Sequence, residues 1–191
     1  MLRRQLPVAA VLAFLGAAAQ QSSAALQPRN GRIVFTHLGA RAGRDQIYTT
    51  TATGTRRRQL TSNRRFSSFA PSYSPNGKRI VFVRALRQSD LWQMQANGTR
   101  PRRLTWTQRI SEATPSWSPD GAQIVFAVVL PAALRGIWVV DSERSNRHRL
   151  TSGLDAEPAW SPNGSEIAFQ RYDQTSQTFA IFAVAPSGGT S

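Results

Sequence analysis

Cysteine is absent from the 191-residue sequence, and histidine and lysine are scarce. Without cysteine the chain forms no disulfide and offers neither a thiolate nucleophile nor a cysteine ligand for zinc. The two histidines, His37 in a stretch that resembles a loop and His148 near a short strand, lie beside no serine-nucleophile motif and pair with no carboxylate in the sequence. The glycines fall singly in turns and form no phosphate-binding loop. We therefore expect a non-enzymatic chain with no catalytic residues, no metal site and no cofactor.

Acidic residues are also few, and the charge is unevenly distributed along the chain. The formal net charge is +14, and arginine carries nearly all of the positive charge because Lys78 is the only lysine. Residues 41–109 hold 15 basic and 2 acidic side chains, whereas residues 110–191 hold 5 basic and 8 acidic ones. Such asymmetry is typical of proteins with an anionic partner. It also fits solvated arginines without a function, so both interpretations stay open.

No hydrophobic run is long enough to span a membrane comfortably. The longest lies near the start, from Leu6 to Ala19, after two arginines and before small residues that include Ala24. This order of basic, apolar and small residues is typical of a signal peptide. We predict a signal peptide at residues 1–24, no membrane span after its cleavage, and export to the periplasm or the outside of the cell.

One twelve-residue pattern occurs three times and a shortened form occurs once. The full copies are PSYSPNGKRIVF at 71–82, PSWSPDGAQIVF at 115–126 and PAWSPNGSEIAF at 158–169, and NGRIVF begins at residue 30. The turn glycines Gly31, Gly77, Gly121 and Gly164 are separated by 46, 44 and 43 residues. A near-constant period of this length indicates a repeat architecture. Proline fixes the first corner of the turn, asparagine or aspartate tolerates the second, and glycine accepts the left-handed position that follows.

Each period contains four short segments typical of β-strands. In the third unit they are PSWS, which begins at a proline, then QIVFAVV, IWVVD and HRLT. Four short antiparallel strands per unit match the blade of a β-propeller. We predict an all-β propeller of four-stranded antiparallel blades, with residues such as Ile124, Phe126 and Ile137 packed between blades.

The pattern W-S-P-D-G-x-x-I-x-F, followed by I-W or I-Y and then R-x-L-T, resembles the WD40-like PD40 repeats of the TolB family over residues 30–191. The resemblance implies an exported, non-enzymatic, protein-binding module, and in that family the repeats build a six-bladed propeller. The α/β domain that precedes the propeller in TolB has no counterpart here.

Only about four blades are present, because the first unit lacks its first strand and the last lacks its R-x-L-T strand. We expect part of a larger propeller rather than a complete four-bladed ring, and self-association if the ring is incomplete. Two alternatives stay open: the propeller portion of a prolyl oligopeptidase-like peptidase without its catalytic domain, and a structural repeat protein whose basic charge is incidental.

In a propeller, the Ser-Pro turns lie at one end of the blades, and the connections between blades lie at the other. Arginine and aromatic side chains are frequent anchors of protein interfaces. We therefore expect a partner, either a protein or an anionic envelope component, to bind a set of residues in these connections that we call the arginine-rich rim. The rim comprises Arg64, Arg65, Phe66, Arg84, Arg87, Trp106 and Arg109. Export and the lack of a recognisable nucleic-acid-binding module argue against a nucleic acid partner.

Overall fold

The computed structural model describes residues 31–38, 43–107, 109–143 and 146–188. Residues 32–191 form one compact unit, and the fold described below belongs to that unit. The predicted signal peptide at residues 1–24 lies outside the described residues. No helix in the described ranges has the length and apolar character needed to cross a membrane.

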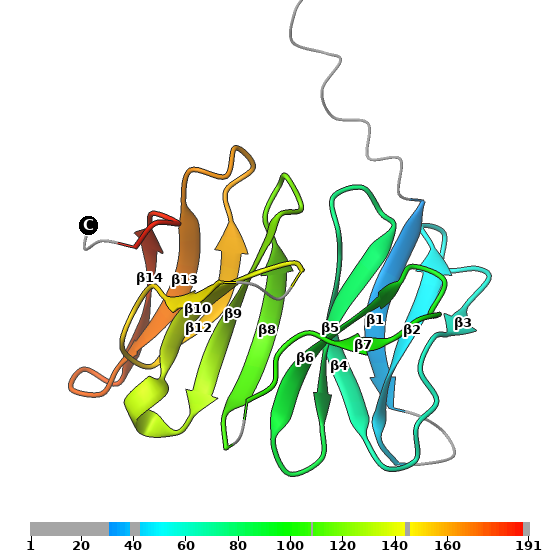
Figure 1. The fold of residues 1–191 in the computed structure, drawn as a ribbon, viewed down its shortest axis with the longest axis horizontal. Helices are drawn as coiled ribbons and strands as arrows, with labels where there is room; N and C mark the ends of the chain where they lie inside the picture. The colour runs from blue at the N-terminus through cyan, green and yellow to red at the C-terminus, as the bar shows by residue number, and fades with distance from the viewer. Residues whose placement is uncertain (1–30, 39–42, 108, 144–145, 189–191) are drawn as a thin grey trace, which may run out of the picture. The chain divides into compact units, whose positions relative to one another are not determined.

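The unit consists of four antiparallel sheets that follow one another in chain order (Figure 1). The first sheet contains β1 (Arg32–Leu38), β2 (Asp45–Thr51) and β3 (Arg58–Gln59), and the second contains β4 (Ser67–Tyr73), β5 (Arg79–Ala85), β6 (Ser89–Gln95) and β7 (Arg102–Arg103). The third contains β8 (Ser111–Trp117), β9 (Gln123–Leu130), β10 (Gly136–Asp141) and β11 (Arg147–Arg149), and the fourth contains β12 (Asp155–Trp160), β13 (Ile167–Asp173) and β14 (Thr178–Val184). A 3-10 helix, η2 (Ala132–Leu134), connects β9 to β10.

This arrangement confirms the predicted all-β fold of antiparallel blades. Each of the two middle blades has four strands, whereas the first and the last have three. Contacts between strands of different sheets join consecutive blades, with β4 against β1 and β2, β8 against β4 to β6, and β12 against β8 to β10. The first strands β4, β8 and β12 therefore lie beside one another in consecutive blades.

The Ser-Pro-Asp-Gly turn is held by its serine and aspartate side chains as well as by its backbone. Ser118 Oγ donates to Asp120 Oδ1 at 2.6 Å and accepts the N–H of Gln123 at 2.9 Å, while the N–H of Ala122 donates to Asp120 Oδ1 at 2.9 Å. These bonds lower the pKa of Asp120, the Ser118 hydroxyl contributing most. The turns at Ser74 and Ser161 repeat the same pattern. Serine thus stabilises this turn together with the proline, the asparagine or aspartate, and the glycine that follow it.

Glycine in this turn adopts a left-handed conformation, and Gly121 has a φ of 73°. A Cβ added there would lie 3.6 Å from Pro75 Cδ of the preceding blade, which is an ordinary contact. Gly121→Ala should therefore lower the free energy of unfolding by about 1 kcal/mol through backbone strain alone. Urea denaturation measures this difference.

Gly31→Ala is the matched control, because Gly31 is the equivalent glycine of the first unit and its added Cβ would meet nothing within 4 Å. This substitution should leave the unfolding free energy unchanged. Equal losses in the two variants would show that the left-handed turn does not set the cost.

In the second, third and fourth blades, proline lies inside the first strand and not at its start, which corrects the sequence interpretation. Pro115 follows Thr114, whose φ is 48°, and the pairing of β8 with β9 shifts between Ala113 and Ser116. Ala70 and Glu157 precede the equivalent prolines with φ of 49° and 52°. Because proline has no N–H, a β-bulge accepts it where a regular strand would not. The strand therefore extends on both sides of the proline.

Each inner blade has two apolar faces, which we call front, toward the preceding blade, and back, toward the following one. The front of the third blade packs Ile124, Phe126 and Val128 on Val81 and Val83 of the second. Its back packs Val125, Ala127, Ile137 and Val139 on Ile167, Phe169 and Val184 of the fourth. The first junction packs Ile47 against Ile80, Phe82 and Met94. The predicted packing of Ile124, Phe126 and Ile137 between blades is confirmed.

The threonine of each Leu-Thr ending makes a polar contact at the junction between blades. Thr105 Oγ1 accepts the N–H of Leu91 at 3.0 Å and donates to the carboxylate of Glu112, which belongs to the next blade. Thr151 repeats this contact with Ile137 and with Asp155, the latter at 2.5 Å. We call each of these contacts a threonine latch. At the first junction Thr61 accepts the N–H of Ile47 and donates to Gln46, because Ser68 stands where the next blade would supply the acid.

Candidate partner-binding rim

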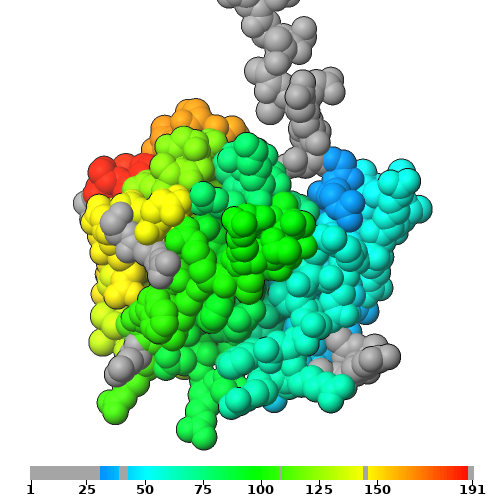
Figure 2. Space-filling view, turned by 45° about the vertical axis from the view of Figure 1, so that its right-hand side comes forward, coloured from blue at the N-terminus to red at the C-terminus, as the bar shows by residue number. Residues whose placement is uncertain are grey.

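The rim loops lie at the end of the blades opposite to the Ser-Pro turns. In the second blade, Tyr73 pairs with Ile80 beside the turn, and Ser67 pairs with Ala85 at the rim end. In Figure 2 the second blade and its flanking loops, coloured cyan-green to green, run from the top to the bottom of the visible face, and several side chains project at the lower end.

Gln88 joins two of the rim loops. Its amide donates to the carbonyl of Thr107 at 2.6 Å, and its Oε1 accepts the N–H of Arg109 at 2.9 Å. The β5–β6 loop, which carries the exposed Arg87, is thereby fixed to the β7–β8 loop, which carries the exposed Trp106 and Arg109. The structure brings these three predicted rim residues together.

Asn63 shapes the loop that carries Arg64, Arg65 and Phe66. Asn63 Oδ1 accepts the N–H groups of Arg65 and Phe66 at 2.7 and 3.2 Å. The carbonyl of Phe66 accepts from Gln46 Nε2 at 3.1 Å, which attaches the loop to β2. The side chains of Arg64 and Arg65 are exposed, whereas Phe66 is half-buried. This loop therefore presents two arginines on a fixed backbone.

Arg84 is not a loop residue, which corrects its assignment to an exposed rim loop. It lies in β5, on the same face as Phe82, because side chains two positions apart in a strand share a face. Its guanidinium lies 4.0 Å from the ring centroid of Trp92, 5.5 Å from that of Phe82 and 5.9 Å from that of Phe66. Burial lowers the pKa of Arg84. Arg84 is a packing residue that supports Phe66.

Trp106 is 72% exposed, the most exposed rim aromatic. The guanidinium of Arg103 lies 4.6 Å from its ring centroid and pairs with Asp90 Oδ1 at 2.6 Å. Cation–π stacking and the ion pair together hold the indole ring in one orientation. Arg103 belongs to β7, the outermost strand of the second blade, and no sequence pattern predicted its stacking on Trp106.

A buried carboxylate, that of Glu112, contacts the two residues that flank Trp106 in the chain, Thr105 and Thr107. Glu112 is fully buried, and Thr107 Oγ1 lies 3.3 Å from both Glu112 Oε1 and Asp90 Oδ1. Burial raises the pKa of Glu112 to about 7, and the charge of Asp90 adds to the rise. Hydrogen bonds from Thr105 and Leu91 and the charge of Arg147, 3.9 Å away, oppose it. The sequence signal was an acidic residue three positions before the strand proline, at both Glu112 and Asp155.

Glu112 should make stability depend on pH. The folded protein keeps the proton on Glu112 up to about pH 7, whereas an ordinary glutamate loses it near 4.5. The unfolding free energy should therefore fall by roughly 3 kcal/mol as the pH rises from 4.5 through 7, because the folded state binds more protons. Glu112→Gln removes the titrating carboxyl and with it this pH dependence. The free energy of unfolding of the variant, measured by urea titration, should therefore increase relative to that of the wild type as the pH rises from 4.5 through 7.

Glu157→Gln is the control, since Glu157 is an exposed carboxylate on a neighbouring first strand. This variant separates the effect of the buried carboxyl from the general effect of replacing a glutamate with glutamine. A stability difference that stays constant with pH for Glu112→Gln would show that folding does not raise the pKa of Glu112.

The two histidines lie on strands. His37 belongs to β1, where its ring meets that of Tyr48 edge-on at 5.4 Å, so the loop assignment was wrong. His148 belongs to the outer strand β11, and its Nε2 lies 3.3 Å from the carbonyl of Pro186. Within the described part of the chain, no three His, Asp or Glu side chains are grouped so that they could hold a metal ion.

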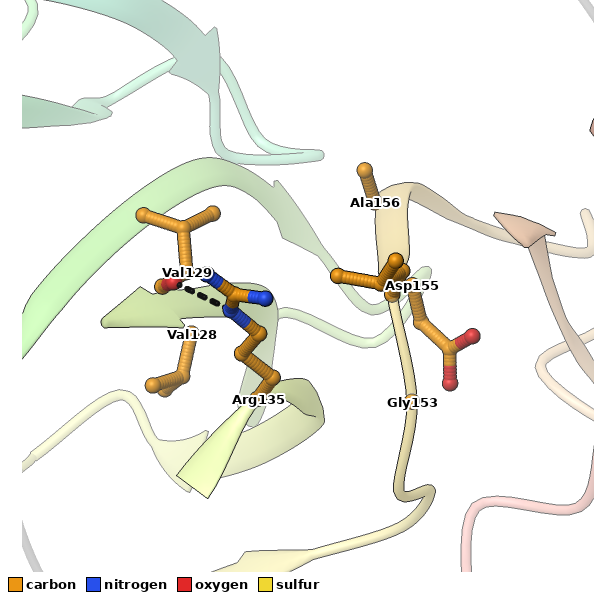
Figure 3. Close-up of a pocket in the computed structure, with 7 residues that line it drawn as sticks. Val128, Val129, Arg135, Gly153, Asp155 and Ala156 are labelled. Carbon is orange, nitrogen blue, oxygen red and sulfur yellow. Dashed lines mark hydrogen bonds between the residues drawn. The ribbon is translucent and has the colours of Figure 1, made fainter. Parts of the chain in front are cut away.

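A hollow of about 260 Å³ lies between the third and fourth blades at the rim end (Figure 3). Val128, Val129, Leu154 and Ala156 provide its apolar lining, together with Arg135, Gly153 and Asp155. Arg135 Nε donates to the carbonyl of Val129 at 3.0 Å. The carboxylate of Asp155 points away from Arg135 in Figure 3 and pairs with Arg171 at 2.6 and 2.8 Å. Both charged groups are thus engaged in structural contacts, and the hollow is a weaker candidate site than the rim.

Known structures with this architecture include two TolB proteins and a peptidase. The putative TolB from Agrobacterium tumefaciens aligns with a TM-score of 0.74 and 24% identity over 86% of this chain and 61% of its own. TolB from Acinetobacter baumannii aligns with a TM-score of 0.69 and 24% identity over 85% of this chain and 40% of its own. A Mycobacterium tuberculosis puromycin-hydrolyzing peptidase aligns with a TM-score of 0.62 and 15% identity over 85% and 30%. No family model and no curated protein matches the sequence.

The chain therefore has a TolB-like β-propeller fold over most of its described length. It spans less than two thirds of the TolB chains that it matches. Because a peptidase shares the same architecture at low identity, the likeness shows the fold alone.

Proposed function

We propose that this chain is an exported, non-enzymatic TolB-like propeller that binds a protein partner through its arginine-rich rim. The observation that supports the proposal most is the exposed Trp106 beside Arg87 and Arg109, on loops that Gln88 fixes together. Tryptophan and arginine are enriched among the residues that contribute most to protein–protein binding. A large aromatic ring left in water and held in place by Arg103 is prepared for such contact.

The charge of the rim favours an acidic partner surface. Arg64, Arg65, Arg87 and Arg109 are all exposed, and no ion pair involves them among the described residues. Unpaired exposed arginines accelerate encounter with an acidic surface, and the acceleration falls with ionic strength. Trp106 then supplies apolar contact area that salt does not screen. The proposed site thus combines electrostatic attraction with one aromatic anchor.

The test changes the four exposed rim arginines to serine in one variant. Arg84 stays unchanged, because its removal would disturb packing. Capture of cross-linked partners from an envelope extract, quantified by mass spectrometry, should fall at least about tenfold for any specific partner, since exposed rim charges mainly govern association. Raising the salt concentration should shrink the difference between variant and wild type, because screening acts over about 8 Å at physiological ionic strength.

The control removes the same charge at the opposite end of the blades. It changes four exposed residues near the Ser-Pro turns to serine, namely Arg56, Arg58, Lys78 and Arg100. Capture should be retained. Equal losses in both variants would show that net charge acts as a diffuse field and that the rim is not the site. Rim-dependent binding to vesicles of anionic phospholipid, with no captured protein, would assign a lipid surface instead and contradict the proposal.

A further inference from the structure

The first blade has an uncovered front face. Its isoleucine Ile33 is 51% exposed. The residues at the same position in the following blades, Ile80, Ile124 and Ile167, are 0% exposed because each meets the blade before it. Phe35 stacks with Tyr48 on the same face, with ring centroids 6.0 Å apart. The sequence of the first blade thus keeps the apolar pattern of a covered front face.

The fourth blade has the corresponding uncovered back face. Ile181 is 74% exposed, whereas the residues at its position in the preceding blades, Ile47, Leu91 and Ile137, are 0% exposed. Their equivalence follows from the strand register, since each pairs with the same position of the neighbouring second strand. Phe179, two positions before Ile181 and on the same face, is 64% exposed. Apolar surface of this kind in water marks an interaction site.

We propose that two copies of the chain associate head to tail, the back face of the fourth blade in one copy covering the front face of the first blade in the other. The chain itself forms this kind of junction three times, always between the back of one blade and the front of the next. The two uncovered faces are one of each type. A second copy therefore continues a packing geometry that the molecule already uses.

The charge distribution favours this orientation over its alternatives. Residues 41–109 carry a net charge of +13 and residues 110–191 one of −3. A head-to-tail junction places the basic end of one copy beside the acidic end of the other. Front-to-front contact would instead bring two strongly basic ends together, and like charges in contact oppose association.

Sedimentation equilibrium of the full 191-residue chain tests the association directly. The proposal expects a species of at least twice the chain mass of 21.0 kDa, in reversible equilibrium with the monomer. Ile33→Glu and Ile181→Glu should each weaken association by at least about 100-fold, because each leaves a charge without a partner inside an apolar junction. Circular dichroism should stay unchanged, because both side chains are exposed in the single chain.

The control is Leu86→Glu, which changes an equally exposed apolar residue in a rim loop outside both faces. This variant should associate like the wild type. A wild-type chain that stays monomeric at all concentrations would overturn the proposal. Association that survives Ile33→Glu would also overturn it, because the front face would then not be part of the contact. Association that survives Ile181→Glu would exclude the back face in the same way.

The absence of cysteine allows a second measurement. One preparation carries Ile33→Cys and another Ile181→Cys, and a short bismaleimide cross-linker is added to each alone and to their mixture. Head-to-tail association predicts cross-linked dimers in the mixture and almost none in either preparation alone. Cross-linking within the Ile181→Cys preparation alone at the level of the mixture would contradict it.

Discussion

Each blade of this protein is one sheet thick and apolar on both sides, so it buries both faces only when it lies between two neighbours. The third blade meets this requirement fully: Phe126 is buried against the second blade, and Ile137 is buried against the fourth. Full burial of such a side chain contributes about 1.5–3 kcal/mol relative to exposure. The first and last blades meet the requirement on one side only, which makes Ile33 and Ile181 the exceptions to the pattern.

Polar contacts at the same junctions connect this packing to the rim. The threonine latch formed by Thr105 joins the end of one blade to Glu112 in the first strand of the next. The residue after Thr105 is Trp106, so the latch that closes the junction also fixes the start of the loop that presents the indole ring. Ser89 Oγ, at the start of β6, donates to the carbonyl of Glu112 at 2.7 Å and adds the end of the β5–β6 loop to the same contact. The geometry of the rim therefore depends on how well two blades pack.

The sequence was informative where a local pattern determines the structure. The Ser-Pro turns, the alternation that buries Ile124 and Phe126, and the missing strands at both ends follow from short-range pattern and period. It was less informative where residues distant in the chain meet. Arg84 lies between Trp92 and Phe66, and Arg103 stacks on Trp106, because of side-chain packing that no spacing encodes.

The prediction that proline begins the first strand of a blade was wrong for a different reason. A regular strand accepts a proline at its first residue, but the bulge that accepts it inside β8 depends on pairing with β9 and on the left-handed conformation of Thr114. For Glu112 a signal was present, because an acidic residue occurs three positions before the proline in two of the three full units. Its meaning became clear only when the threonine latch placed that carboxylate against the preceding blade.

The dependence of every blade on two covered faces is tested most directly by amide hydrogen exchange measured over a dilution series. The account predicts that the amides of β9 and β10 exchange slowly at every concentration, because both faces of their blade are covered within the chain. The amides of β1 and β14 should exchange increasingly fast on dilution, because the second copy that covers the outer faces of the first and fourth blades then dissociates. Protection of β14 equal to that of β10 in the dilute limit, or loss of protection in all four blades together, would contradict the account.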